Sequence, residues 1–527
     1  MKGITICTGP SGVKVRECLG RLNGTLDTPR PIASVEKTIS SVAGMELIEF
    51  LGLPSPILRE HWRRGATQVI GEAVESPSPV FLTFHAAYYH QRTRGFIPAV
   101  ELDVLQPLRG KVDKVLVFID DVYDVYLRLL ATGEMYEDVL AQEPHAALLS
   151  SIFNLIILLY WREIEIALSS AIGHYVGARM YIVATKHPCC VAKRLVENES
   201  NDLRIYYLSH PITTIRKEAE SQFPSFVGRL ATVIDALLSQ DDTVLFIPTT
   251  IDELAMKRAK RGEGDVFLPE LSQRWSHQDQ SLMFPSLPDE TSSLNPLNPC
   301  SYELSEGTGS DVSYLLNHLW LQIYRQTVSR DYSMVDQAHS GIIAVRPLYE
   351  GHFADGVMNE IKYNLRLMGS EPNRAAFIFT CANDAQKYAV SRLFTDLRLG
   401  LSAPPRDLGQ KQQTWLRDAE KMCRLNFTDF ISRLEREVLP RGYAFLPKVL
   451  SSSSMWSGEL VKKSERRKQW LKTAWERMQR DEVIQALAEE RLDGLTRVSC
   501  ETFEEQTFWS KMLEYLNNKM YHTRRLL

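Results

Sequence analysis

A glycine-rich turn near the start of the chain could hold a phosphate group. The apolar segment Ile4–Thr8 has the composition of a strand, and it is followed by Gly9, Ser11 and Gly12 and then by a helical stretch. Backbone N–H groups of such a turn, together with the N-terminus of the next helix, form a concave surface that binds phosphate oxygens. Lys14 adds a cation at the end of the turn. The sequence therefore predicts a nucleotide-binding turn.

This segment resembles the start of a P-loop nucleoside or nucleotide kinase, but its motif is incomplete. The motif GxxxxGK[ST] needs a second glycine, a lysine and a hydroxyl residue, and counted from Gly9 these positions hold Lys14, Val15 and Arg16. Val15 cannot reach a phosphate, and Arg16 offers no hydroxyl to Mg²⁺. Asp120, which follows a later apolar segment, resembles the aspartate that holds Mg²⁺ in such enzymes. The resemblance implies a P-loop fold that binds ATP and Mg²⁺, or that serves only as a scaffold, with ATP turnover disfavoured.

A second set of polar residues begins at the end of a predicted strand near residue 205. The strand includes Tyr207, and Ser209, His210 and Pro211 form the turn that follows it. Much later in the chain, a segment that ends in Glu360 reads as the start of a helix. Together these segments place a carboxylate, a phenol and a small polar turn on predicted neighbouring elements.

These segments are similar, in the same order, to the nucleoside 2-deoxyribosyltransferase family. The opening strand of that family reads roughly I-Y-L-A-G-P, which places Tyr207 on the family's tyrosine. Asp331 lies in a stretch that resembles the helix carrying a substrate-facing aspartate. Gly356 and Glu360 match the glycine and the catalytic glutamate of the family's D-S-G-T-x-x-E and S-x-G-V-x-x-E motifs. The resemblance covers about residues 203–385.

The resemblance implies an enzyme that cleaves or transfers at the N-glycosidic bond of a nucleoside, nucleotide or dinucleotide. Breaking this bond develops positive charge at C1′, which a carboxylate can stabilise or attack without a cofactor. Glu360 would be the nucleophile, Asp331 would supply or organise a proton for the leaving base, and Tyr207 would orient Glu360. Hydrolysis and transfer to a second base both stay open. By analogy, a degenerate kinase-like module beside such an enzyme suggests a bacterial defence or toxin-like effector.

Further residues are expected to contact the substrate. Gly356 would let the backbone approach a sugar or phosphate without a Cβ clash. The family has Asp or Ser six residues before its glutamate, whereas this chain has Ala354 there and Asp355 one place later. The expected substrate-binding residues are Ser209, His210, Pro211, Arg346, Asp355 and Gly356.

Each of the main residues also has a structural alternative. Glu360 could complement the dipole of its helix, and Asp331 could be a helix N-cap. Tyr207 could serve in packing alone, His210 could be a turn residue, and Arg346 could pair with a nearby carboxylate. Two other functions also remain: phosphoryl transfer by the N-terminal part, and a non-catalytic nucleotide-sensing scaffold.

Apolar runs alternate with helical stretches through the first 400 residues, which is the pattern of α/β domains with parallel sheets. We expect two three-layer domains: a P-loop kinase-like domain at 1–200, and a Rossmann-like, deoxyribosyltransferase-like domain at 201–400 with an insertion at about 255–325. From about residue 404 the strand pattern stops, so residues 401–527 are predicted to be mainly helical. The expected strands are 4–8, 80–84, 114–119, 180–184, 204–208, 243–248, 341–346 and 376–380.

Bulk properties indicate a soluble cytoplasmic protein. The net charge of −4 gives no general reason to expect nucleic acid as a partner, and the basic run at 462–472 is diluted by acidic residues. The apolar run 146–161 is shorter than the roughly 20 residues that span a bilayer, so a buried helix is favoured. The eight cysteines include no CxxC pair, which indicates free thiols and no metal site. The family resemblance adds an expected homo-oligomer acting on a small molecule.

Overall fold

The fold is known from a computed structural model. It describes residues 3–44, 49–50, 52–90, 93–99, 101–132, 146–199, 202–212, 214–215, 223–251, 253, 256–261, 264–269, 310–349, 352–371, 373–384 and 498–523. The basic run at 462–472 and the middle of the expected insertion lie outside these residues. The described part is an α/β protein with two five-stranded sheets.

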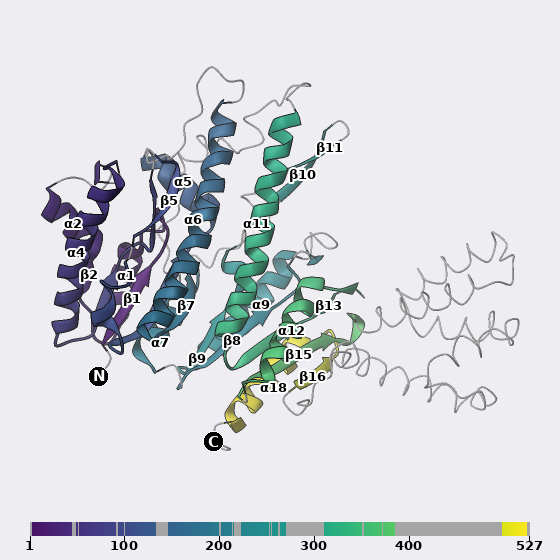
Figure 1. Cartoon of the computed structure of the whole chain (residues 1–527). Coiled ribbons are helices and arrows are strands. Elements are labelled where there is room, and N and C mark those ends of the chain that lie inside the picture. Colours follow the sequence, from purple (N-terminus) through teal and green to yellow (C-terminus); the bar gives the residue numbers. More distant parts are fainter. Residues whose placement is uncertain are drawn as a thin grey trace, which may run out of the picture. The chain divides into compact units, whose positions relative to one another are not determined.

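The first sheet is parallel, with strand order β2-β3-β1-β6-β7 (Figure 1). The expected strands at 4–8, 80–84, 114–119 and 180–184 are confirmed. Their apolar segments are buried because helices cover both faces of a parallel sheet. The strands are β1 (Ile4–Thr8), β2 (Ile32–Ser34), β3 (Val80–Thr83), β6 (Val112–Ile119) and β7 (Arg179–Ala184).

Helices and a hairpin connect the strands of the first sheet. The hairpin pairs β4 (Ala87–His90) with β5 (Gly95–Pro98), directly after β3, and a short 3-10 helix, η1 (Gln106–Leu108), precedes β6. The helices are α1 (Val15–Asn23), α2 (Val35–Ala43), α4 (Ser55–Glu75), α5 (Val122–Thr132), α6 (Ala146–Val176) and α7 (Cys189–Glu197).

The second sheet has strand order β16-β15-β12-β8-β9. Numbered along the chain and read from the β9 edge, this order is 2-1-3-4-5, which belongs to a doubly wound α/β sheet whose connections change direction between the first and third strands. Here those two strands are β8 and β12. The strands are β8 (Arg204–Ser209), β9 (Thr243–Phe246), β12 (Gly341–Val345), β15 (Ala375–Cys381) and β16 (Val498–Phe503).

Both ends of the segment expected to be an insertion, at about 255–325, form regular secondary structure. Its start forms a hairpin of β10 (Met256–Arg261) and β11 (Gly264–Pro269). Its end is the first part of α11 (Ser310–Gln337), so residues 310–325 belong to the same helix as Asp331. The other elements are η3 (Pro248–Thr250), β13 (Leu348–Tyr349), β14 (His352–Phe353), α9 (Phe223–Leu238), α12 (Asp355–Met368) and α18 (Phe508–Thr523).

The prediction that strands stop after about residue 404 is wrong at β16. This strand pairs in parallel with β15 at the edge of the second sheet. Val498 and Phe503 enclose mostly polar residues, so the strand lacks the continuous apolar run by which the central strands were found. The helix expected near residues 502–521 is confirmed, but it begins only at Phe508.

By its internal contacts, the chain divides into two compact units. The first unit comprises residues 1–207 and 240–339, and the second comprises residues 208–239 and 340–527. The first sheet and α11 belong to the first unit. The helices α9, α12 and α18 and the strands β12, β15 and β16 belong to the second.

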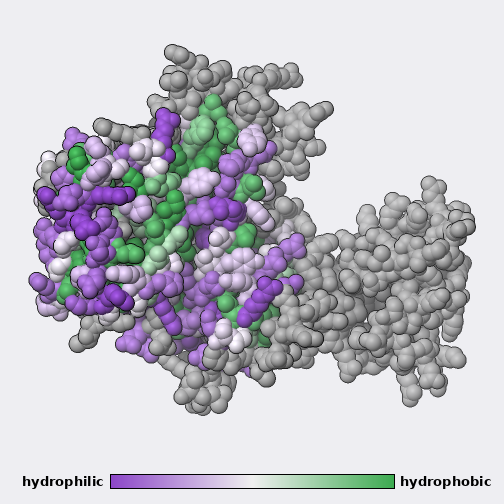
Figure 2. Space-filling model, viewed as in Figure 1, coloured by the Kyte–Doolittle hydropathy of each residue, from purple (hydrophilic) through white to green (hydrophobic). Residues whose placement is uncertain are grey.

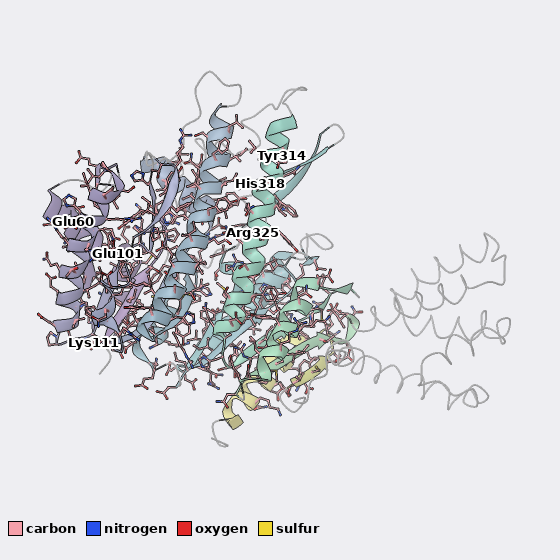
Figure 3. The ribbon with its side chains drawn as sticks, viewed as in Figure 1. Glu60, Glu101, Lys111, Tyr314, His318 and Arg325 are labelled. Atoms are coloured by element: carbon pink, nitrogen blue, oxygen red, sulfur yellow. The ribbon has the colours of Figure 1, made fainter. Side chains whose placement is uncertain are left out.

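Two long helices, α6 and α11, pack against each other in the first unit (Figure 1). The apolar run at 146–161, predicted to be a buried helix, forms the first half of the helix α6. Figure 2 shows apolar residues on the surface over this helix. Tyr314, His318 and Arg325 lie along α11 (Figure 3), and Arg325 donates a 2.9 Å hydrogen bond to Glu163 of α6. Of the helices that the structure describes, none combines the length and apolar character needed to cross a membrane.

Candidate active site

Glu360 and Ser209 form a hydrogen-bonded pair in the second unit. Ser209 is the last residue of β8, and Glu360 lies in the second turn of α12, the helix that follows β12. The hydroxyl of Ser209 donates to Oε2 of Glu360. Ser209 is fully buried, whereas Glu360 is partly exposed. Open α/β sheets bind ligands outside the carboxyl ends of strands at the point where the connections change direction, and this pair belongs to such a point.

The sequence of α12 explains why Glu360 has a defined position. Apolar residues at helical spacing bury one face of the helix. The C-terminal part is fixed by Asn364, which is fully buried, donates to the carbonyl of Ala375 at 3.2 Å and accepts from Arg374 at 3.2 Å. Because Glu360 lies beyond the first turn, the helix dipole gives it little stabilisation. The buried apolar residues of α12 are Val357, Met358, Ile361 and Leu365.

Gly356 does not form the turn that the sequence suggested. It is the second residue of α12 and is exposed, and a Cβ added there would meet no atom within 4 Å. The protein itself therefore places no steric demand for glycine at this position. Asp355, the first residue of the helix, is also exposed, and its charge complements the helix N-terminus.

Arg346 forms an ion pair within the second unit. Its Nε and Nη2 atoms donate to the two oxygens of Asp384 at 2.6 and 2.7 Å, and its guanidinium lies 4.7 Å from the ring centre of Tyr349. Burial by itself would lower the pKa of Arg346, but the hydrogen bonds and charge of Asp384 raise it. The alternative that Arg346 pairs with a nearby carboxylate is thus confirmed.

His210 and Pro211 continue from Ser209 as a buried turn. The amide of Ile212 donates to the carbonyl of His210 at 2.9 Å, and the His210 ring stacks on Phe226 with ring centres 6.2 Å apart. This turn fixes the end of β8 and hence the position of the Ser209 hydroxyl.

Tyr207 and Asp331 belong to the first unit, where both lie close to Arg330. Asp331 lies near the end of α11, so the N-cap alternative is wrong. The Arg330 guanidinium donates to Oδ1 of Asp331 at 2.9 and 3.1 Å and to the carbonyl of Ile251 at 3.2 Å. Burial raises the pKa of Asp331, and Arg330 opposes that rise. Tyr207 is fully buried and is close enough to influence the pKa of Arg330.

Glu253, which the sequence gave no reason to select, continues this buried network. It accepts from Arg162 at 2.5 and 2.9 Å and from the amide of Val122 at 2.6 Å. Arg162 also donates to the carbonyl of Asp120 at 3.3 Å and to Gln326. The network therefore links the end of β6 to α11 within the first unit.

The N-terminal turn has the close backbone packing expected of its glycines. A Cβ on Gly9 would lie 2.6 Å from the carbonyl oxygen of Phe118, so only glycine fits there. Gly12 and Lys14 have left-handed backbones, with φ of 81° and 56°. The Lys14 side chain is exposed and lies 3.9 Å from Glu17, and Ser11 is half-buried.

A carboxylate from α6 occupies this end of the first sheet. Oε1 of Glu165 accepts from the amides of Gly9 at 3.1 Å and Ala86 at 2.7 Å, and Oε2 accepts from the amide of Ala87 at 3.0 Å. Nδ1 of His85 donates to the carbonyl of Gly9 at 2.5 Å. Burial raises the pKa of Glu165 to about 7, while His85 and the three amides act in the opposite direction.

The negative charge of Asp120 is paired with a positive charge within the first unit. Its Oδ2 forms a buried ion pair with Arg128, and its Oδ1 accepts from the amide of Asp121 at 2.8 Å. Arg128 also donates to the carbonyl of Gly12 at 2.9 Å, which ties the N-terminal turn to α5. Asp124 on α5 and Lys186, which follows β7, form a further ion pair.

Glu165, Glu253 and Asp384 were missed because their partners lie far away in the sequence, so no local motif marks them. For Glu165, the spacing of polar residues along α6 was a sequence pattern that could have identified it. Trp161, Glu165 and Ser169 are spaced by four residues on α6, and all three bond to strand ends. The Trp161 indole donates to the carbonyl of Ala87 at 2.9 Å, and the Ser169 hydroxyl lies 2.7 Å from that of Thr8.

Comparison with known proteins adds no family assignment. No model of a known protein family matches the chain, and a search of curated proteins finds no significant match. Within the described ranges, no group of three or more His, Cys, Asp or Glu side chains is arranged to hold a metal ion. The chain is an α/β protein with a carboxylate–hydroxyl pair at one set of strand ends and paired opposite charges at another.

Proposed function

We propose that the chain cleaves or transfers at the N-glycosidic bond of a nucleoside, nucleotide or dinucleotide, with Glu360 as the nucleophile. The observation that carries the proposal is the hydrogen bond from Ser209 to Glu360 where the connections of the second sheet change direction. A partly exposed carboxylate at such a point can meet a bound ligand. The proposal includes the finer fold assignment, a P-loop kinase-like region followed by a deoxyribosyltransferase-like one.

The proposed reaction begins when a Glu360 oxygen attacks C1′ of the sugar. The C1′–N bond breaks, its electron pair passes to the base nitrogen, and a glycosyl ester of Glu360 forms. Water or a second base then attacks C1′ and loses a proton to solvent, while the C1′–O bond breaks and its electron pair returns to Glu360 as a free carboxylate. Ser209 holds Oε2 of Glu360, so we assign the attack to Oε1.

The leaving base gains stability when a proton is supplied to it. Asp331 is the candidate donor implied by the family resemblance, and burial raises its pKa, a direction that keeps a proton available closer to neutral pH. Arg330 opposes this by favouring the ionised form. The supporting role of Tyr207 is likewise taken from the resemblance.

Release of free base tests the proposal. Wild-type protein is incubated with a panel of nucleosides, nucleotides and NAD, and the products are separated by chromatography. We expect free base from at least one member of the panel, and a loss of about 10³-fold or more in Glu360→Gln. The matched control is Glu514→Gln, which removes an exposed carboxylate of α18 paired with Lys511.

Two results contradict the proposal. One is a wild-type protein that releases no base from any member of the panel. The other is release at the same rate in Glu360→Gln as in the wild type, which would assign the activity to other residues.

A further inference from the structure

Glu165 has the environment of a bound anion rather than that of an ordinary helix side chain. Three backbone amides converge on its two oxygens at 2.7 to 3.1 Å, one from the turn after β1 and two from the segment after β3. Glu165 is fully buried. Backbone amides that converge in this way at strand ends bind phosphate and carboxylate groups, because they stabilise negative charge without a side-chain cation.

Neighbouring groups complete this environment. Because a carbonyl can only accept, the 2.5 Å contact between Nδ1 of His85 and Gly9 places a proton on that ring nitrogen. The amide of His85 and the hydroxyl of Tyr88 donate to a different carboxylate, Glu36, at 2.7 and 3.1 Å. The three amides around Glu165 are therefore directed at that one side chain, and Glu36 has donors of its own.

We propose that the ends of β1 and β3 form an oxyanion site that the chain fills with its own carboxylate, Glu165. An external oxyanion binds there only when this side chain is removed. The ligand class is a small carboxylate or phosphate, since the site presents three amide donors to two oxygens.

The position of Asp120 fits the same interpretation. Metal-binding aspartates of phosphoryl-transfer sites hold Mg²⁺ beside the phosphate. Here Arg128 forms an ion pair with Asp120 and also donates to Gly12 in the glycine-rich turn. In the first unit, Glu165 thus takes the position of a bound anion and Arg128 takes the position of a bound cation.

Chemical rescue of Glu165→Ala tests the proposal. The full chain is prepared as wild type, as Glu165→Ala and as Glu163→Ala, a control on the same helix whose exposed carboxylate pairs with Arg325. Unfolding temperatures are measured in rising sodium formate, and separately in inorganic phosphate, with sodium chloride at equal ionic strength as the reference. We expect Glu165→Ala to lose about 5 °C or more. Formate should recover most of that loss in a saturable way, with little effect on the other two proteins.

Recovery by formate, by phosphate or by both supports the proposal and shows which oxyanion fits the site, whereas equal effects of both anions on all three proteins would overturn it. If Glu165→Ala does not fold, amide hydrogen exchange of the wild type replaces it. The amides of Gly9, Ala86 and Ala87 should exchange as slowly as those of β3. Rapid exchange at these three amides would show that Glu165 does not hold them.

Discussion

Two glutamates at strand ends differ in what surrounds them. Glu165 in the first unit is fully buried and accepts three backbone hydrogen bonds. Glu360 in the second unit is partly exposed and accepts from a serine hydroxyl. Both follow from the same architecture, because parallel sheets bring turns and helix starts together at the carboxyl ends of their strands.

A carboxyl group at the strand ends of a parallel sheet can therefore have either a structural or a chemical role. A carboxyl group enclosed by amides satisfies three buried donors, so it stabilises the folded chain. A partly exposed carboxylate held by a side chain can approach a ligand, which is the arrangement expected of a reacting group.

Removal of each carboxylate should affect stability very differently. Glu165→Ala leaves three buried amides without their acceptor, at about 1–3 kcal/mol each, so we expect a loss of about 3 kcal/mol or more. Glu360→Ala should change the free energy of unfolding by about 1 kcal/mol or less, because its site is partly exposed. Denaturant unfolding measures both values. Similar losses in the two variants would remove the contrast.

Glu165 should also make stability depend on pH. Its pKa in the folded chain, about 7, is raised above the ordinary glutamate value by burial. The folded state therefore holds the proton more tightly, and this contribution is complete below about pH 4.3 and is lost as pH rises through 7. Relative to Glu165→Gln, wild-type stability should fall by about 1.4 kcal/mol per pH unit across that interval. A flat difference between the two proteins would contradict this prediction.

Ser209 acts as a positioning residue for Glu360 in this account. Ser209→Ala removes a hydrogen bond to a charged group, so we expect kcat/KM for base release to fall about 10-fold. The lost donor should also move the acid limb of the pH–rate profile to higher pH, because the ionised form of Glu360 loses support. Ser209→Thr should restore both. A rate loss without a change in the pH profile would indicate a structural role alone.

Gly356→Ala should give the smallest change. Alanine suits the helical position of residue 356 better than glycine, and its Cβ would meet no atom within 4 Å. The variant should therefore be more stable by about 0.5–1 kcal/mol. Thermal unfolding measures the difference, and a less stable variant would contradict the helical placement of this residue.

The sequence predicted the buried strands better than the contacts at their ends. Residues 115–119 within β6 and Gly341–Val345 are continuous apolar runs, which is why the matching predictions were confirmed. The edge strand Val498–Phe503 has no such run and was missed. Its position depends on pairing with a strand more than a hundred residues earlier, which local composition does not encode.

The candidate site was predicted only in part for the same reason. Motif spacing selected Glu360, but nothing in the sequence pairs this residue with the Ser209 hydroxyl, which donates to its carboxylate. The Arg346–Asp384 pair joins residues 38 positions apart. Such pairings depend on how strand ends meet in three dimensions, and a single sequence gives residue types but no partners.

The most direct test is a search for a covalent glycosyl ester on Glu360. Wild type and Glu360→Gln are incubated with each compound that yields free base, quenched in acid, digested, and analysed by mass spectrometry. We expect one added sugar unit on the wild-type peptide that contains Glu360, and none on the variant. Base release without any adduct on that peptide, or an adduct on another residue, would contradict the assignment of Glu360 as the nucleophile.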